Sequence, residues 1–273
     1  MKKIRVIPVV LFKNGRVVQS KNFKIHRPVG TPTVIIDRLS AWNCDEVICL
    51  DISRDDKIFE NRSDLNFENQ KNFLDVLNSV SKHCFMPLTA GGKIDNIETA
   101  KKFIENGADK ISINSIVHED FDIVEKFAKN FGSQCIVVSI DVKFYDNEWK
   151  IFYKNGKVMS NKNYKKFVQE LENSGAGEIL INSIDFDGEA KGYNVELFNE
   201  IKNLVKIPII SLGGVGHWDH FLEIIKLDLV DAVAAANIFH FTENSYYNAI
   251  DYLKKNNINV RKNLLSNLSV YKI

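Results

Sequence analysis

Eight short apolar segments recur along the chain, and this repetition limits the folds that the chain can adopt. The segments are rich in isoleucine and valine and mostly continuous, as is typical of parallel strands covered on the outside. They span 4–10, 46–51, 85–89, 110–114, 135–141, 178–183, 207–212 and 230–236. Stretches of helical period lie between them, among them 96–106, 163–173 and 217–226. This alternation predicts an α/β fold, a (β/α)8 TIM barrel, as one domain over residues 1–273.

The two halves of the chain resemble one another. A Gly-Gly pair at 91–92 follows one strand, and a second pair at 213–214 follows another strand about half a chain later. Glu46 and Glu178 also stand at matching positions, near the starts of two similar strands. A repeat of this length indicates two fused half-barrels rather than a solenoid of short units. The polar residues 53–70 are expected to form a loop on the active face.

Charge and cysteine content exclude several functional classes. The chain has 36 basic and 35 acidic residues, whereas a protein that binds nucleic acid needs a basic surface. Its four cysteines lack zinc-finger spacing, which indicates buried, reduced thiols in a cytoplasmic protein. The N-terminus is too polar for a signal peptide, and no window approaches a membrane span. We therefore expect no nucleic acid, membrane, metal or cofactor as a partner.

The first and fifth strands differ where a barrel enzyme places its acid or base. The fifth strand ends at Asp141, whereas the first ends at Leu11, just before the turn 13–16. Catalytic groups of barrels lie at the C-terminal ends of the strands. The internal symmetry of the chain relates these two strand ends, but only one of them carries a carboxylate. Asp185 also follows a strand and is a candidate acid or base, but a turn or helix-capping role is a serious alternative for this residue. The other strand-end residues that predict a substrate pocket are Asp51, Asn182, Asp187 and Gly188.

Each Gly-Gly pair predicts a phosphate site. Backbone amides can approach an anion closely where glycines join a strand to a helix, and barrels commonly hold phosphate between such a loop and the next strand end. A tight turn without a ligand is the alternative, but two pairs in register with polar partners favour phosphate. The residues concerned are Gly91, Gly92, Asn114, Ser115, Gly213, Gly214, Ala236 and Asn237.

Four charged residues mark the opposite ends of the strands: Arg5, Glu46, Lys110 and Glu178. Unpaired charges near a barrel axis would each be costly, whereas alternating signs around a ring let each charge satisfy two neighbours. Four unrelated solvated charges are the alternative, but the match of Glu46 with Glu178 favours a ring. Asp109, beside Lys110, is expected to face a partner protein.

Over almost its whole length the chain resembles the HisF family, the cyclase subunit of imidazole glycerol phosphate synthase. The matching stretches are 13–18, 45–52, 107–114, 131–134, 175–180, 183–188 and 239–241. The resemblance implies a duplicated half-barrel that receives ammonia from a HisH-like glutaminase and acts on a phosphorylated small molecule. It also implies that Asp141 is one of two catalytic aspartates. The ammonia gate of the family falls on Arg5, Glu46, Lys110 and Glu178.

The sequence departs from the HisF pattern at several positions of the cyclisation site. Leu11 replaces the second aspartate and has no ionisable atom, and Asn182 replaces a threonine. A specialised branch of HisF-like proteins, which builds acetamidino groups on bacterial surface sugars, shares these two replacements. The other departures are Gln19 for a lysine, Lys93 for a glycine, Leu212 for a serine and Glu189 for a threonine.

We therefore expect a HisF-like subunit that passes ammonia from a glutaminase into the amidination of a bacterial surface sugar, with a sugar amidotransferase as a further partner. The first alternative is a working cyclase, a lyase of histidine biosynthesis that forms imidazole glycerol phosphate. The second is a non-catalytic scaffold that activates the glutaminase. Turnover with free ammonia would support the first alternative, and glutaminase activation without a bound anion would support the second.

Overall fold

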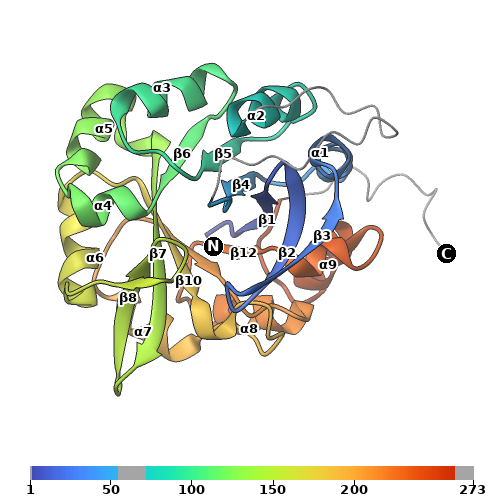
Figure 1. The fold of residues 1–273 in the computed structure, drawn as a ribbon. Helices are drawn as coiled ribbons and strands as arrows, with labels where there is room; N and C mark the ends of the chain where they lie inside the picture. The colour runs from blue at the N-terminus through green and yellow to red at the C-terminus, as the bar shows by residue number, and fades with distance from the viewer. Residues whose placement is uncertain (1, 55–71, 262–273) are drawn as a thin grey trace.

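The computed structural model describes residues 2–54 and 72–261, and a closed ring of eight parallel strands forms its centre (Figure 1). These strands are β1 (Arg5–Lys13), β4 (Val47–Asp51), β5 (Leu88–Gly91), β6 (Lys110–Ile113), β7 (Ile136–Tyr145), β10 (Glu178–Ser183), β11 (Ile209–Leu212) and β12 (Ala232–Ala235). They follow one another around the ring in this order, and β12 pairs with β1 to close it. All eight strands predicted from the sequence are present, and the (β/α)8 TIM barrel is confirmed.

Helices cover the outside of the ring (Figure 1). Three of them were predicted: α3 (Ile97–Glu105), α6 (Tyr164–Asn173) and α8 (Trp218–Lys226). The sequence determines them locally, as α3 illustrates: the Asn96 side chain accepts from the backbone of Thr99, and Ala100 and Phe103 are buried. The other helices are α1 (Pro32–Ala41), α2 (Phe73–Ser81), α4 (Ser115–Glu119), α5 (Ile123–Phe131), α7 (Val195–Lys202) and α9 (Ser245–Lys255), with 3-10 turns η2 (Ser133–Cys135), η3 (Ile184–Phe186) and η4 (Asn237–His240).

Two barrel strands continue beyond the ring as antiparallel hairpins, which the sequence analysis missed. The expectation that Leu11 and Asp141 end their strands is wrong, because Leu11 still pairs with Val18 and Asp141 with Phe152. Positive φ at Asn14 and the following glycine supplies the two-residue turn of the first hairpin. The added strands are β2 (Arg16–Lys21) and β3 (Ile25–Gly30) in the first hairpin, and β8 (Glu148–Tyr153) and β9 (Val158–Met159) in the second.

The barrel strands separate two apolar regions, because successive side chains of a strand point to opposite faces. In β1, Val6 and Val10 belong to the layer between the strands and helices, whereas Ile7 and Leu11 belong to the cluster inside the barrel. The same alternation places Arg5 on the interior row. Arg5 and Leu11 therefore mark the two ends of one row, about 20 Å apart along the strand.

The loop expected at 53–70 lies almost entirely outside the described residues.

All four cysteines are free thiols, with Cys44 and Cys49 buried as expected. Cys84 and Cys135 are only half-buried, since they lie in the turns before β5 and β7 rather than within those strands. In the described part of the chain, no helix is long and apolar enough to cross a membrane.

Candidate active site and charged ring

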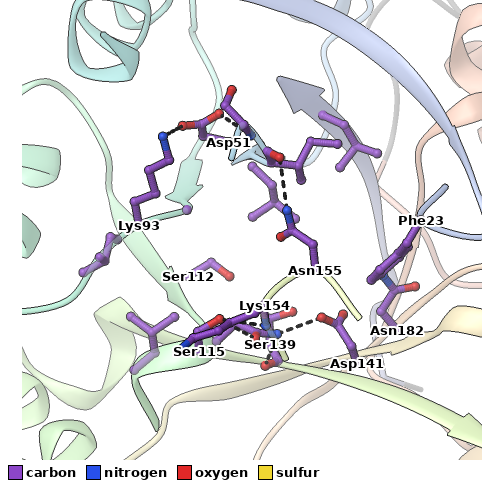
Figure 2. A pocket seen from close by; sticks show the side chains of 18 of the residues that line it. Phe23, Asp51, Lys93, Ser112, Ser115, Ser139, Asp141, Lys154, Asn155 and Asn182 are labelled. Atoms are coloured by element: carbon purple, nitrogen blue, oxygen red, sulfur yellow. Dashed lines mark hydrogen bonds and ion pairs between the residues drawn. The ribbon is translucent and has the colours of Figure 1, made fainter. Parts of the chain in front are cut away.

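A cavity of about 370 Å³ lies at the C-terminal mouth of the barrel (Figure 2). This volume suits a small metabolite. Its apolar wall comes from Val9, Leu11, Leu50, Leu212 and Ala236. Its polar wall includes Asp51, Ser112, Asn114, Ser115, Ser139, Asp141, Asn182 and Asp187. Within residues 2–54 and 72–261, no group of three or more His, Cys, Asp or Glu side chains could hold a metal ion.

Asp141 is the buried carboxylate of this cavity. Nδ2 of Asn114 donates to its Oδ2 at 3.0 Å, and the side chain of Asn182 also hydrogen bonds to it. Burial raises the pKa of Asp141 to about 7, although these two hydrogen bonds oppose the shift. Both protonation states are therefore populated near neutral pH. This is the range in which a carboxylate works as a general acid or base.

Leu11 faces the same cavity from the opposite side of the barrel. Its strand, β1, is separated from β7 by three strands in each direction around the ring. Leu11 is 9% exposed and belongs to the interior apolar cluster together with Val9 and Val18. The β1 position that matches Asp141 therefore presents hydrocarbon to the cavity.

The first Gly-Gly loop packs tightly against the end of β4. A Cβ on Gly92 would lie 2.3 Å from the backbone oxygen of Asp51, and φ is +106° at this glycine. Lys93 follows with its Nζ 3.9 Å from Oδ2 of Asp51 (Figure 2). Gly92, Lys93, Asn114 and Ser115 all line the cavity, whereas Gly91 does not. This loop therefore combines a close-packed turn with a cation at the cavity wall.

The second Gly-Gly loop contributes less to the cavity. A Cβ on Gly214 would overlap the backbone oxygen of Gly192, so close backbone packing requires this glycine. Of the second set of predicted phosphate residues, only Ala236 lines the cavity. Asn237 instead holds the first hairpin: its Nδ2 donates to the oxygen of Ser20 at 2.7 Å, and its Oδ1 accepts from the Ser20 amide at 3.3 Å.

Asp187 also holds the first hairpin. Its Oδ2 accepts from Oγ of Ser20 at 2.7 Å and from the amide of Phe23 at 3.2 Å. Burial raises the pKa of Asp187, and these two hydrogen bonds oppose the shift. A Cβ on Gly188 would lie 2.4 Å from the Ser20 oxygen, so this glycine permits close packing rather than lining the cavity. Asp185 lies outside the cavity and accepts from the amide of Phe144 on β7, 41 positions away, which is neither a pocket role nor a local turn or helix cap.

The two hairpins bring further residues to the cavity that sequence reasoning did not select. Nδ2 of Asn155 donates to the oxygen of Ile52 at 3.2 Å and so ties the second hairpin to the end of β4 (Figure 2). A Cβ on Gly156 would lie 3.0 Å from the Phe23 ring, which shows that the hairpins meet. Asn-Gly pairs at 14–15 and 155–156 are the turn signals that could have revealed these hairpins. The hairpin residues that line the cavity are Ser20, Phe23, His26, Lys154 and Asn155.

A closed ring of ion pairs lies at the N-terminal ends of the strands, as predicted. Arg5 reaches Oε1 of Glu46 at 2.5 Å and Oε2 of Glu178 at 2.8 Å. Nζ of Lys110 reaches Oε2 of Glu46 at 3.1 Å and Oε1 of Glu178 at 2.6 Å. Burial alone would raise the pKa of Glu178, but the hydrogen bonds and charges of Arg5 and Lys110 outweigh it and lower the pKa. Each of the four charged groups therefore contacts two groups of opposite charge.

Asp109 has a structural role that the sequence did not reveal. Its Oδ2 accepts from the amide of Leu88 at 2.8 Å, so the carboxylate fixes the start of β5. Its contact with a partner protein stays a prediction. Asp45 and Asp231 accept in the same way from the amides of Val6 and Ile209. Each of the strands β4, β6 and β12 is thus preceded by an aspartate that accepts from a backbone amide near the start of an adjacent strand.

Fold and site together define a TIM barrel with a polar cavity at one mouth and an ion-pair ring at the other. The family model of histidine biosynthesis proteins matches residues 5–245, and the chain belongs to this family as a HisF-type member. It is 37% identical over 258 residues to imidazole glycerol phosphate synthase subunit HisF of Hydrogenobaculum sp. (strain Y04AAS1), covering 94% of this chain and 98% of the relative. Identity is 38% over 259 residues to HisF of Clostridium botulinum (strain 657 / Type Ba4), with the same coverage. It is also 38% over 262 residues to a hisF2 protein of Vibrio vulnificus (strain YJ016), covering 96% of this chain and 92% of that one.

Proposed function

We propose that this chain is the ammonia-accepting subunit of a glutamine-dependent synthase, with a HisH-like glutaminase at its N-terminal mouth. The relatives carry the names of synthase subunits, which supports an assembly of this kind. The ion-pair ring stands where ammonia would enter. From Arg5 the interior row of β1 leads through Ile7 and Val9 to the cavity at Leu11. Neutral ammonia would travel along this apolar interior, whereas the ring would hold back ions.

Asn182 and Asp141 suit the arrival of ammonia in the cavity. Within the described part of the chain, Oδ1 of Asn182 has no hydrogen-bond partner, and an N–H donor would satisfy it. Asp141 lies beside it, with a pKa raised by burial to about 7. A carboxylate poised in this range can take the proton that ammonia loses when it adds to an electrophilic carbon.

We propose further that the acceptor is a bacterial surface sugar, which gains an acetamidino group with the help of a sugar amidotransferase. The observation that carries this choice is Leu11. The HisF cyclase that the sequence resembles uses an aspartate at this place, and leucine moves no proton. Lys93 and the loop of Gly92 offer a place for the phosphate of a phosphorylated substrate.

A second candidate function is that of a working imidazole glycerol phosphate synthase cyclase, a lyase of histidine biosynthesis. The similarity to HisF subunits over 94% of the chain favours it. On this proposal Asp141 would act with a different second group, and the cavity offers Asp51 and Asp187. Both of these carboxylates already bind neighbouring protein groups, Lys93 and Ser20 respectively, which makes them weaker candidates for proton transfer.

Cyclase turnover tests the choice between these functions. The purified protein is given the histidine-pathway ribonucleotide and saturating ammonium chloride, so that no glutaminase is needed. We expect a rate far below about 1 s⁻¹, the lower end for ordinary enzymes. A rate at or above this value would overturn the sugar proposal and establish the cyclase. Leu11→Asp alone should not fully restore cyclase activity, because Gln19, Asn182 and Leu212 also differ from the HisF pattern.

A further inference from the structure

A second cavity, of about 620 Å³, lies between the two hairpins and beside the central cavity. Phe23, His26 and Asn155 line both cavities and form the wall between them. The second cavity is separate from both Gly-Gly loops, because neither loop contributes to its lining. We call it the hairpin cleft.

Basic side chains dominate the hairpin cleft. Among residues 2–54 and 72–261, the one acidic residue of its lining is Asp185. The Oδ2 of Asp185 accepts from the Phe144 amide, and its Oδ1 lies 3.9 Å from Nζ of Lys143. Lys24 and Lys157 are exposed and form no ion pair with another residue of 2–54 or 72–261. The basic lining residues are Lys13, Lys24, His26, Arg54, Lys143 and Lys157. Like charges gathered in a concave site repel one another, and a bound anion would relieve that repulsion.

The contact between Lys13 and His26 shows how the cleft is prepared for an anion. Nζ of Lys13 lies 3.1 Å from Nδ1 of His26. An ammonium group can only donate, so Nδ1 is the acceptor and the neutral ring carries its proton on Nε2. Burial lowers the pKa of His26, and the charges of Lys13 and Arg54 lower it further. This hydrogen bond holds the Lys13 ammonium group in place and uses one of its three N–H donors. The other two donors take no part in it and could bind an anion.

We propose that the hairpin cleft binds a small molecule through an oxyanion, either a phosphoryl or a carboxylate group. Its cationic donors come from three separate segments: Lys13 and Lys24 from the first hairpin, Arg54 from the end of β4, and Lys157 from the second hairpin. Donors that converge from several segments on one concave site bind a compact ligand better than an extended partner. The shared wall lets the anion be either a distal group of the molecule in the central cavity or an independent ligand.

Binding of inorganic pyrophosphate, measured by calorimetry at low ionic strength, tests this site without any catalytic assay. The double variant Lys24→Glu/Lys157→Glu reverses two exposed charges of the cleft and leaves both Gly-Gly loops intact. We expect it to bind pyrophosphate about tenfold or more weakly, with added salt reducing the difference. Lys226→Glu, which changes an exposed lysine of α8, is the matched control and should bind as wild type. Equal affinity of the double variant and wild type would overturn the proposal.

Crystals soaked in sodium tungstate locate the anion. Tungstate density beside Lys24 and Lys157 supports the site, and density confined to the loops of Gly92 and Gly214 would refute it. Fructose 1,6-bisphosphate then distinguishes the two sources of the anion. If fructose 1,6-bisphosphate spans both cavities, its affinity falls in Lys24→Glu and also in Lys93→Glu, which changes the central cavity. If it binds in the hairpin cleft alone, its affinity falls in Lys24→Glu and not in Lys93→Glu.

Discussion

Asn114 donates a 3.0 Å hydrogen bond to the buried carboxylate of Asp141. The same Nδ2 lies 3.1 Å from the backbone oxygen of Ser139, so β7 holds the Asn114 side chain at two points. A residue expected to bind phosphate therefore positions Asp141, the proposed acid–base group. These two contacts fix the orientation of Asn114 and Asp141 in the polar wall of the cavity.

Asp141→Asn should stabilise the protein above neutral pH. Burial raises the pKa of Asp141 from 3.8 to about 7, so the folded protein binds this proton more tightly than the unfolded chain. Folding is consequently penalised as pH rises from about 4 to 7, and the full penalty persists above 7. In urea unfolding, the variant should gain on the order of 1–4 kcal/mol over wild type at pH 8 and little at pH 4.

Asp185→Asn provides the control for this comparison, because its carboxylate lies outside the cavity. The change in stability of Asp141→Asn between pH 4 and pH 8 is compared with that of this variant as well as with that of wild type. A difference between Asp141→Asn and wild type that stays constant over this range would mean that Asp141 ionises with an ordinary pKa.

Asn237→Ala should loosen the first hairpin. The change leaves both the amide and the carbonyl of Ser20 without their side-chain partner, which costs about 1–3 kcal/mol of unfolding free energy. Hydrogen exchange at the Ser20 amide should become faster. Asn237→Asp keeps the acceptor and loses the donor, so its effect should be smaller on Ser20 exchange than that of alanine. Unchanged exchange in Asn237→Ala would contradict a holding role for this side chain.

His118→Phe should reduce the acid sensitivity of the protein. The ring of His118 stacks between Tyr153 at 4.5 Å and Phe167 at 4.9 Å, and burial together with the charge of Lys162 lowers its pKa to about 4. The stability that neutral His118 contributes is complete above its ordinary pKa of 6.5 and is lost as pH falls toward 4. Phenylalanine preserves the stack without titrating. Thermal unfolding from pH 7 to 4.5 should show a smaller loss than wild type, and parallel curves would rule the mechanism out.

The barrel and its charged ring were predictable because each depends on patterns within single strands. Continuous apolar runs mark strands that are buried on both faces, and the charges of Glu46 and Glu178 stand at the starts of matching strands. The hairpins were not predicted because β1 and β7 extend past Leu11 and Asp141 through residues of mixed polarity. Beyond Asp141, Lys143 is partly exposed, so the pattern of a covered parallel strand ends before the strand does.

The roles of Asn114 and Asn237 were not accessible from the sequence. Each follows a strand and a Gly-Gly loop, as a phosphate ligand would. Their partners are Asp141 and Ser20, and Ser20 is 217 positions away from Asn237. Such partners are set by the closure of the barrel and the docking of the hairpin. A pattern of residues along one segment carries no information about them.

Lys110→Ala should uncouple glutamine hydrolysis from the use of ammonia if the ring gates its entry. The change removes two ion pairs, to Glu46 and Glu178, and leaves both carboxylates with Arg5 alone. Product formation driven by glutamine should fall, while the reaction driven by ammonium chloride stays as in wild type. Because loss of one partner of a buried pair can destabilise by several kcal/mol, both assays are run well below the measured unfolding temperature. Lys226→Ala, an exposed change on α8, should alter neither reaction. If both reactions decline equally in Lys110→Ala, the ring stabilises the barrel and does not admit ammonia.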